Sequence, residues 1–279
     1  MPTMLSVLEI RKALTSLFVL LSALLSNNAF ATSVQVVHEI ASGTDIREGK
    51  SVFLRYVTQP RFSQAITDGY VQVQDQLATS SLPHQSSFVF WPASGLFDLS
   101  KSAKLNEQRK EIQNVLYQAA KQEQRKSDTL ALEQDAAQWE KSSFLSRVPL
   151  TVNFDQARLG PLENPLLTGN FLLYLPSRPQ QIQVFGPVAG KRTITWQPGQ
   201  SLDDIVDASK PIGHLSDRDF AKVISPGGQV STFGIAYWNK EDVLLVPGSA
   251  VFFPYSIFSD GDNNVNSKIV ELLSNRLAQ

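Results

Sequence analysis

The residue types that usually carry catalytic or metal-binding chemistry are scattered along this sequence. Its three histidines, His38, His84 and His214, show neither an H-x-x-x-H pair nor any other metal-ligand spacing. The chain has no cysteine, which excludes thiolate nucleophiles, disulfides and cysteine-bound metals. The sequence therefore nominates no catalytic residue, no metal site and no cofactor.

One pair of adjacent carboxylates resembles a catalytic pair. Asp203 and Asp204 fall in the first turn of a helix predicted over 202–208, where Ser201 is a good N-cap residue. Adjacent helical residues face different directions, and negative charge suits the helix N-terminus. We therefore predict a capping role for this pair.

A calcium-loop pattern begins at Asp260. The residues Asp260, Asp262, Asn264 and Glu271 occupy positions 1, 3, 5 and 12 of the calcium-loop template. Position 6 needs glycine for its sharp turn, and Val265 stands there instead. We expect a polar linker and helix cap in this segment.

Three aromatic residues have the chemistry of a sugar-binding surface. The faces of Trp91, Tyr237 and Trp238 can stack on the apolar C–H faces of sugar rings. All three fall in segments with strand character, and aromatic residues in strands are often part of the core. Both a glycan-binding role and a packing role therefore stay open.

The first 31 residues are typical of a cleavable secretory signal peptide. Arg11 and Lys12 precede an apolar run over 13–25, and Ala29 to Ala31 form an A-x-A cleavage site. The run is shorter than the roughly 20 apolar residues that a membrane-spanning helix needs. We predict cleavage after Ala31 and a periplasmic mature protein without a transmembrane segment.

The mature chain has the size and charge of a protein with two ordinary domains. Removing 31 of 279 residues leaves 248. The whole chain has a net charge of −1 and the removed segment contributes +1, so the mature net charge is −2. This balance argues against electrostatic capture of nucleic acid.

Hydrophobic periodicity predicts an α+β chain with two units. The first unit, 32–165, combines strands with a helix over 61–78 and a polar helical hairpin inserted at about 101–145. The second unit, 166–258, is a small mixed sheet with one helix, and the Pro-rich connection ending at Pro165 marks the boundary. The hairpin either packs on its own domain, which we prefer, or serves as an interaction arm. The predicted strands span 33–40, 51–57, 88–91, 148–152, 171–175, 181–186, 192–196, 220–224, 230–238, 243–246 and 250–255.

The last segment, 259–279, is predicted to form an amphipathic helix from Asp262 to Leu277. Its apolar face can pack on its own domain, dock on a partner or pair with copies of itself. We nominate this face as a partner-docking surface. Its residues are Val265, Ile269, Leu272, Leu273 and Leu277.

Several short motifs run from Pro149 to the end of the chain. They are Asn164-Pro165-Leu166-Leu167, Gly169-Asn170-Phe171, Arg178-Pro179, Val184-Phe185-Gly186, Gln197-Pro198-Gly199, Ala236-Tyr237-Trp238-Asn239-Lys240 and Val246-Pro247-Gly248-Ser249. This set resembles the GfcC/YjbG-like family of capsule and exopolysaccharide biosynthesis proteins, and the resemblance is best over 147–279. It is weaker earlier in the chain, where Ala93 follows Trp91-Pro92 in place of the glycine that is usual in the family.

The resemblance implies two β-grasp domains, similar to the soluble-ligand-binding (SLBB) domains of outer-membrane polysaccharide exporters. A helical-hairpin insertion and a C-terminal amphipathic helix complete the implied fold. Arg147 and Arg158 match arginines of the family pattern. A guanidinium at a domain seam either binds an acidic glycan or pairs with a structural carboxylate or a helix end, and we leave both roles open.

These features together predict a periplasmic accessory protein of capsule or exopolysaccharide biosynthesis and export. We expect it to bind polysaccharide, subunits of the outer-membrane export machinery, or both. Two alternatives remain, a polysaccharide-modifying enzyme with Arg147 lining a pocket and an assembly factor that binds only protein. The candidate glycan-binding residues are Arg147, Arg158, Trp91, Tyr237 and Trp238.

Overall fold

The computed structural model describes residues 32–39, 50–79, 88–140, 142, 144–160, 163–258 and 264–278. The predicted signal peptide with its cleavage site after Ala31 lies outside these residues, and so do His84, Asp260 and Asp262. Among the described residues, no helix is both long enough and apolar enough to cross a membrane.

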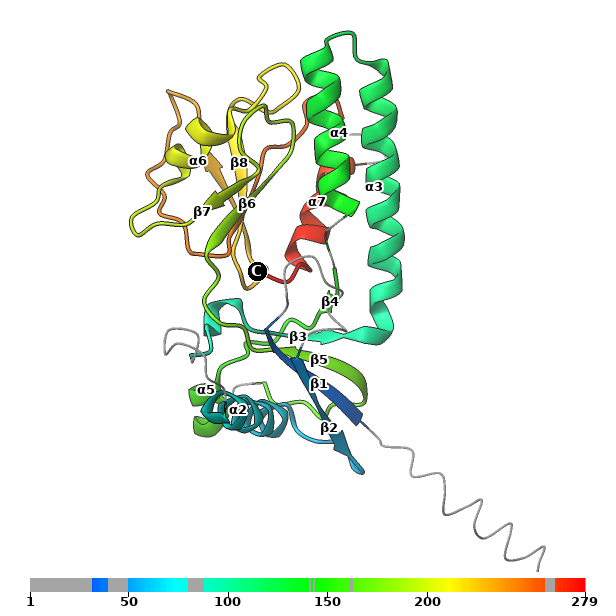
Figure 1. The fold of residues 1–279 in the computed structure, drawn as a ribbon, viewed down its shortest axis with the longest axis vertical. Coiled ribbons are helices and arrows are strands. Elements are labelled where there is room, and N and C mark those ends of the chain that lie inside the picture. Colours follow the sequence, from blue (N-terminus) through cyan, green and yellow to red (C-terminus); the bar gives the residue numbers. More distant parts are fainter. Residues whose placement is uncertain are drawn as a thin grey trace, which may run out of the picture.

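The first sheet is mixed and has one helix between its second and third strands. Its elements are β1 (Thr32–Glu39), β2 (Lys50–Tyr56), α2 (Phe62–Thr79), β3 (Gly95–Asp98), β4 (Ser146–Arg147) and β5 (Gly169–Tyr174). The strand order is β2-β1-β5-β3-β4. β1 pairs antiparallel with β2 and parallel with β5 (Figure 1).

The second sheet repeats this plan. Its elements are β6 (Gln181–Phe185), β7 (Thr193–Thr195), α6 (Leu202–Ser209), β8 (Phe220–Ile224), β9 (Val230–Gly234) and β10 (Ala250–Phe252). The strand order β7-β6-β10-β8-β9 is that of the first sheet, and α6 again connects the second strand with the third. This is the β-grasp arrangement that the resemblance implies, and the predicted α+β class with two β units is confirmed.

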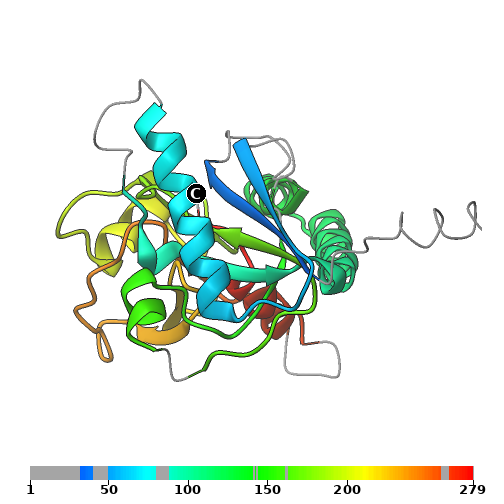
Figure 2. The same cartoon turned by 90° about the horizontal axis from the view of Figure 1, so that it is seen from below.

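Helix α2 lies across one face of the first sheet (Figure 2). Alternation along β1 turns Val34 and Val36 toward this helix, where they join one buried apolar cluster. Gly69 permits the close approach, because a Cβ at this position would stand 2.6 Å from Cδ2 of Leu173 on β5. The helix and the sheet therefore form one continuous core.

Helix α6 begins at the capping box that the sequence predicts. The backbone N–H of Asp204 donates to Oγ of Ser201 at 3.2 Å, and the backbone N–H of Ser201 donates to Oδ2 of Asp204 at 2.9 Å. These reciprocal bonds satisfy two backbone donors at the helix start. The capping role of Asp204 is confirmed.

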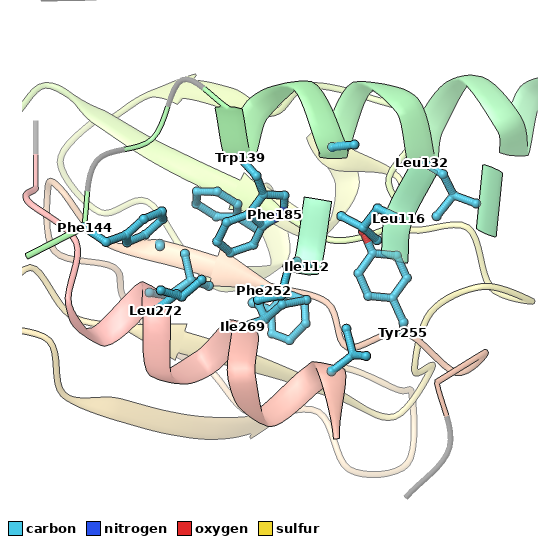
Figure 3. Packing of buried hydrophobic residues seen from close by; sticks show 14 of the residues in the cluster. Ile112, Leu116, Leu132, Trp139, Phe144, Phe185, Phe252, Tyr255, Ile269 and Leu272 are labelled. Carbon is cyan, nitrogen blue, oxygen red and sulfur yellow. The ribbon is translucent and has the colours of Figure 1, made fainter. Parts of the chain in front are cut away.

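The helical hairpin is inserted in the first sheet but packs against the second. It consists of α3 (Ser102–Gln122) and α4 (Lys126–Glu140) and follows the short 3-10 helix η4 (Leu99–Lys101). Ile112 of α3 and Trp139 of α4 share a buried cluster with Phe185 of β6 and Phe252 of β10 (Figure 3). The expectation that the insertion packs on its own domain is corrected, because its apolar stripe covers the far face of the second sheet.

The C-terminal helix α7 (Val265–Ser274) belongs to the same core. It lies between the hairpin and the second sheet (Figure 1). Leu277, just beyond the helix, joins a smaller cluster with Phe97 and Tyr174 of the first sheet. The apolar face that we nominated for docking is thus buried within the chain, with exposed fractions no higher than the 7 % of Val265.

The predicted boundary at Pro165 is corrected by the strand order. β5 follows Pro165 in sequence but lies between β1 and β3, so the first sheet continues to Tyr174. The chain then reaches β6 through residues 175–180. The Pro-rich connection is a loop between elements of the first sheet and is not the boundary between the two units.

Three predicted strands are absent. In the segment 243–246, only Leu244 pairs, in an isolated bridge with Ser201. In the segment 88–91, Trp91 begins the 3-10 helix η3 (Trp91–Ala93), and Pro92 lacks the N–H that a sheet ladder needs. In the segment 148–152, pairing stops after β4 because Pro149 interrupts it. A helix that we did not predict, α5 (Phe154–Leu159), follows.

Candidate functional site

A tight turn replaces the last part of the strand predicted over 230–238. β9 ends at Gly234, and Asn239 holds the following residues together. Its Oδ1 accepts a hydrogen bond from the N–H of Ala236 at 2.9 Å, and its Nδ2 donates to the carbonyl of Asp219 at 2.9 Å. Glu241 accepts from the N–H of Gly234, also at 2.9 Å. Side chains therefore fix the backbone of this turn.

Tyr237 and Trp238 project from the turn, which we call the aromatic turn (residues 236–240). Their exposed fractions are 97 % and 74 %. Large exposed aromatic side chains are more informative than buried ones, because burial is their usual role. Phe220 of β8 pairs with Gly234 at the base of the turn and is also exposed. The packing role considered for Tyr237 and Trp238 does not hold.

An ion pair connects the aromatic turn with the start of α6. Nζ of Lys240 lies 2.5 Å from Oδ2 of Asp203. The hydrogen bond to Asp203 raises the pKa of Lys240 above its ordinary value. Asp203, the first aspartate of the adjacent pair, thus has a structural partner in the aromatic turn.

Sequence reasoning missed the groups that shape this turn. The strand predicted over 230–238 leaves Asn239 and Glu241 in the connection that follows it, although asparagine after an aromatic pair favours an earlier turn. The Asn side chain imitates backbone hydrogen bonding and so stops the strand. This signal was available in the sequence.

Trp91 and Arg158 lie at the two ends of a row of rings in the first unit. The ring centroid of Trp91 is 5.4 Å from that of Tyr70, which is 4.4 Å from that of Phe154. The guanidinium of Arg158 lies 5.6 Å from the centroid of Phe154. Trp91 is half-buried and packs against the core under α2, whereas Arg158 is exposed. The row is mainly a packing feature.

Arg147 lies where both sheets and the C-terminal segment meet. Its Nε donates to the carbonyl of Ser274 at 3.2 Å, and its Nη1 donates to that of Ser94 at 3.4 Å. Its Nη2 donates to the carbonyls of Pro226 at 3.3 Å and Arg276 at 3.2 Å. Four of the five N–H groups of a guanidinium are thereby directed at backbone carbonyls.

The surroundings of Arg147 are apolar and contain a second cation. Its guanidinium lies 4.6 Å from the ring centroid of Phe97, and burial lowers its pKa to about 10. Burial, with the nearby charge of Arg147, lowers the pKa of Arg276 to about 9. None of the hydrogen-bond partners described for Arg147 is a carboxylate. Its geometry favours the pairing with a helix end that we left open, because α7 ends at Ser274.

The two described histidines, His38 and His214, have structural partners. Nδ1 of His38 lies 2.5 Å from the carbonyl of Leu175, and Nε2 of His214 lies 2.6 Å from Oδ2 of Asp128. Asn264 caps α7 by accepting a hydrogen bond from the N–H of Ser267 at 2.9 Å. Within the described part of the chain, no three His, Asp or Glu side chains are grouped to hold a metal ion.

Comparison with known proteins agrees with the sequence motifs. Residues 190–278 match the family model described as capsule biosynthesis GfcC C-terminal. The chain is 24 % identical over 193 residues to the uncharacterized protein YjbG of Escherichia coli (strain K12). The match covers 68 % of this chain and 78 % of that protein. The resemblance to the GfcC/YjbG-like capsule biosynthesis family is confirmed. The GfcC match includes the aromatic turn, α6 and α7, so all three belong to the part of the chain that the family model describes.

Proposed function

We propose that this GfcC/YjbG-like protein is a periplasmic accessory of capsule or exopolysaccharide biosynthesis and export that binds the polysaccharide through its aromatic turn. The observation that carries the proposal is the exposure of Tyr237 and Trp238, at 97 % and 74 %. The family match supplies the pathway. The turn supplies the surface.

The chemistry of the aromatic turn suits a sugar polymer. Aromatic rings offer flat apolar faces for the C–H faces of sugar rings, and the phenol and indole groups add hydrogen bonding. The pair Lys240–Asp203 joins the same turn to α6 and offers charged groups for hydroxyls. Because Asn239 and Glu241 already fix the backbone, little ordering is needed when a ligand binds.

The alternative enzyme and assembly-factor functions have less support. Arg147 was the candidate for lining an enzyme pocket, but its N–H groups are directed at backbone carbonyls. The terminal helix was the candidate for partner docking, but Ile269 and Leu272 are fully buried. Contact with exporter subunits through the aromatic turn is a separate outcome of the test below.

The test is a binding measurement by isothermal titration with polysaccharide purified from the producing cells. We expect the double substitution Tyr237→Ala and Trp238→Ala to weaken binding at least about tenfold, which corresponds to about 1.4 kcal/mol. Phe88→Ala is the matched control, because Phe88 is an aromatic residue of the first unit with the same exposed fraction as Trp238. The control should bind like the wild type.

Two outcomes would overturn the proposal. Equal affinity of the double variant and the wild type would exclude the aromatic turn as the glycan site. Unchanged glycan binding with lost co-purification of exporter subunits would make the turn a protein-docking surface instead.

The proposed compartment has its own test. N-terminal sequencing of the protein from a periplasmic extract should begin at Thr32, because the A-x-A site predicts cleavage after Ala31. A chain that retains Met1 and fractionates with the cytoplasm would contradict the periplasmic assignment.

A further inference from the structure

Within the described part of the chain, the face of the first sheet opposite α2 is open at its β2 end, where Phe53 is exposed. In the strand register, Gln35 of β1 lies opposite Phe53 of β2, and Ser33 of β1 lies opposite Asn170 of β5. Residues opposite each other in neighbouring strands share one face of the sheet. These four side chains therefore form one surface, contributed by three adjacent strands.

A cavity of about 310 Å³ lies over this surface. Leu99 and Ser100 of η4 form its wall, where the chain leaves the sheet to start the hairpin. The volume is at the lower end of the range found for small-molecule sites. None of the described residues that line the cavity is charged.

Gln35 is the most informative residue of this cavity. Gln35 as a whole is 7 % exposed, and its side-chain amide, which makes no hydrogen bond within the described part of the chain, still reaches solvent. The amide can therefore hydrogen-bond to water or to a ligand that enters the cavity.

Phe53 supplies an apolar surface beside this amide. It is 55 % exposed although it lies in the middle of a strand, directly opposite Gln35. An exposed aromatic face next to amide and hydroxyl groups can hold a ring that has both apolar C–H faces and hydroxyl edges. The described lining residues are uncharged and suit a neutral ring, while Arg55 of β2 lies opposite Ser33 on the same face of the sheet.

We infer that this cavity binds one neutral pyranose unit, with Phe53 against the sugar face and with Gln35, Asn170 and Ser33 hydrogen-bonded to its hydroxyls. The inference rests on the proposed function, because it assigns a second subsite for the same class of polymer. It deepens that function by naming a neutral sugar as the group recognised by the first unit.

Saturation-transfer NMR with the mature chain tests this subsite. The probes are the methyl glycosides of glucose, galactose and mannose, with methyl glucuronide as a charged counterpart. We expect at least one neutral glycoside to bind. Its affinity should fall roughly three- to tenfold in Phe53→Ala and in Gln35→Leu, which removes the amide and keeps similar bulk.

The variants separate this subsite from the aromatic turn. Phe53→Ala changes an exposed side chain, so it remains informative if Gln35→Leu does not fold, which a thermal unfolding curve would reveal. Binding of the neutral glycoside should persist in the double substitution of Tyr237 and Trp238. Loss in that variant, with binding retained in Phe53→Ala, would overturn the subsite while leaving the proposed function intact.

Other outcomes also count against the inference. Binding of none of the neutral glycosides to the wild type, or tighter binding of methyl glucuronide, would overturn it. Conversely, loss of glycoside binding in Phe53→Ala with unchanged polysaccharide binding in the aromatic-turn variant would support the subsite and contradict the proposed function.

Discussion

The two sheets have the same strand order and differ in what covers them. In the second sheet, α6 covers one face, while the hairpin and α7 cover the other, so that Phe252 is fully buried. In the first sheet, α2 covers one face, but described residues cover the opposite face only toward Tyr174 and Leu277. Phe53 on that face is half exposed. One strand plan thus yields a closed sheet and an open one.

The difference comes from elements outside the shared plan. The hairpin leaves the first sheet between β3 and β4, yet its apolar stripe is buried against the second sheet. The hairpin thereby links the two units and buries the face of the second sheet opposite α6. Binding surfaces on this fold are therefore expected at the open sheet face and at loops, not on the faces that the insertion covers.

The largest effect on stability is expected from a substitution that disrupts the packing of the hairpin on the second sheet. Asp135 of α4 is fully buried, lies 2.6 Å from Nη1 of Arg192 and accepts a hydrogen bond from the hydroxyl of Tyr255. Asp135→Ala leaves the arginine unpaired, so unfolding free energy should fall by roughly 3–5 kcal/mol. Chemical denaturation measures it, and Glu133→Ala, an exposed residue of the same helix, is the control. A loss of unfolding free energy no larger than that of the control would contradict a stabilising role for this contact between the hairpin and the second sheet.

The second prediction separates packing from docking for α7. Leu272 is fully buried in the cluster under the hairpin. Leu272→Ala should lower the unfolding free energy by roughly 2–5 kcal/mol, because it leaves a cavity in a close-packed core. Ser267→Ala on the exposed side of α7 should change it by less than about 0.5 kcal/mol. If both variants unfold like the wild type and Leu272→Ala alone loses secretion, the helix docks on a partner.

The junction between the two sheets should respond less strongly. Arg147→Ala removes hydrogen bonds to four carbonyls, so we expect a loss of roughly 2–4 kcal/mol in unfolding free energy. Arg158→Ala, at an exposed position, should change stability by less than about 0.5 kcal/mol. The structural role of Arg147 would be contradicted by wild-type stability combined with lost polysaccharide binding.

The smallest effect concerns acid stability at the tip of the hairpin. Burial alone would raise the pKa of Asp128, but hydrogen bonds from His214 and Ser127 outweigh it and hold the pKa below its ordinary value. A carboxylate with a lowered pKa in the folded state stabilises the protein above the unfolded pKa of about 3.9 and loses this contribution as pH falls further.

Asp128→Asn should therefore reduce the fall in denaturation midpoint between about pH 4 and pH 2. Asp155→Asn, at an exposed position on α5, serves as the control and should leave the slope unchanged. Parallel pH profiles for the wild type and Asp128→Asn would exclude this contribution.

Much of the local structure follows from the sequence. Alternation predicts β1 and β2 to within a residue or two, and Ser201 with Asp204 predicts the start of α6. The polar segment without glycine or proline predicts the hairpin, because nothing in it breaks a helix.

What the sequence could not provide is which surfaces meet. The stripe containing Ile112 is equally suited to either sheet, and only the chain path places it on the second. Tyr237 and Trp238 have strand propensity, but the side chain of Asn239 ends the strand and exposes them. Gln35 and Phe53 belong to an ordinary alternating pattern, and among the described residues no helix covers their end of the sheet.

The most direct test of the account is surface polysaccharide in cells that carry the double substitution Tyr237→Ala and Trp238→Ala in place of the wild-type chain. Phe88→Ala cells serve as the control, and immunoblotting checks protein levels. The account predicts a clear loss of surface polysaccharide at normal protein level in the double variant alone. Wild-type amounts of surface polysaccharide in that variant would contradict it.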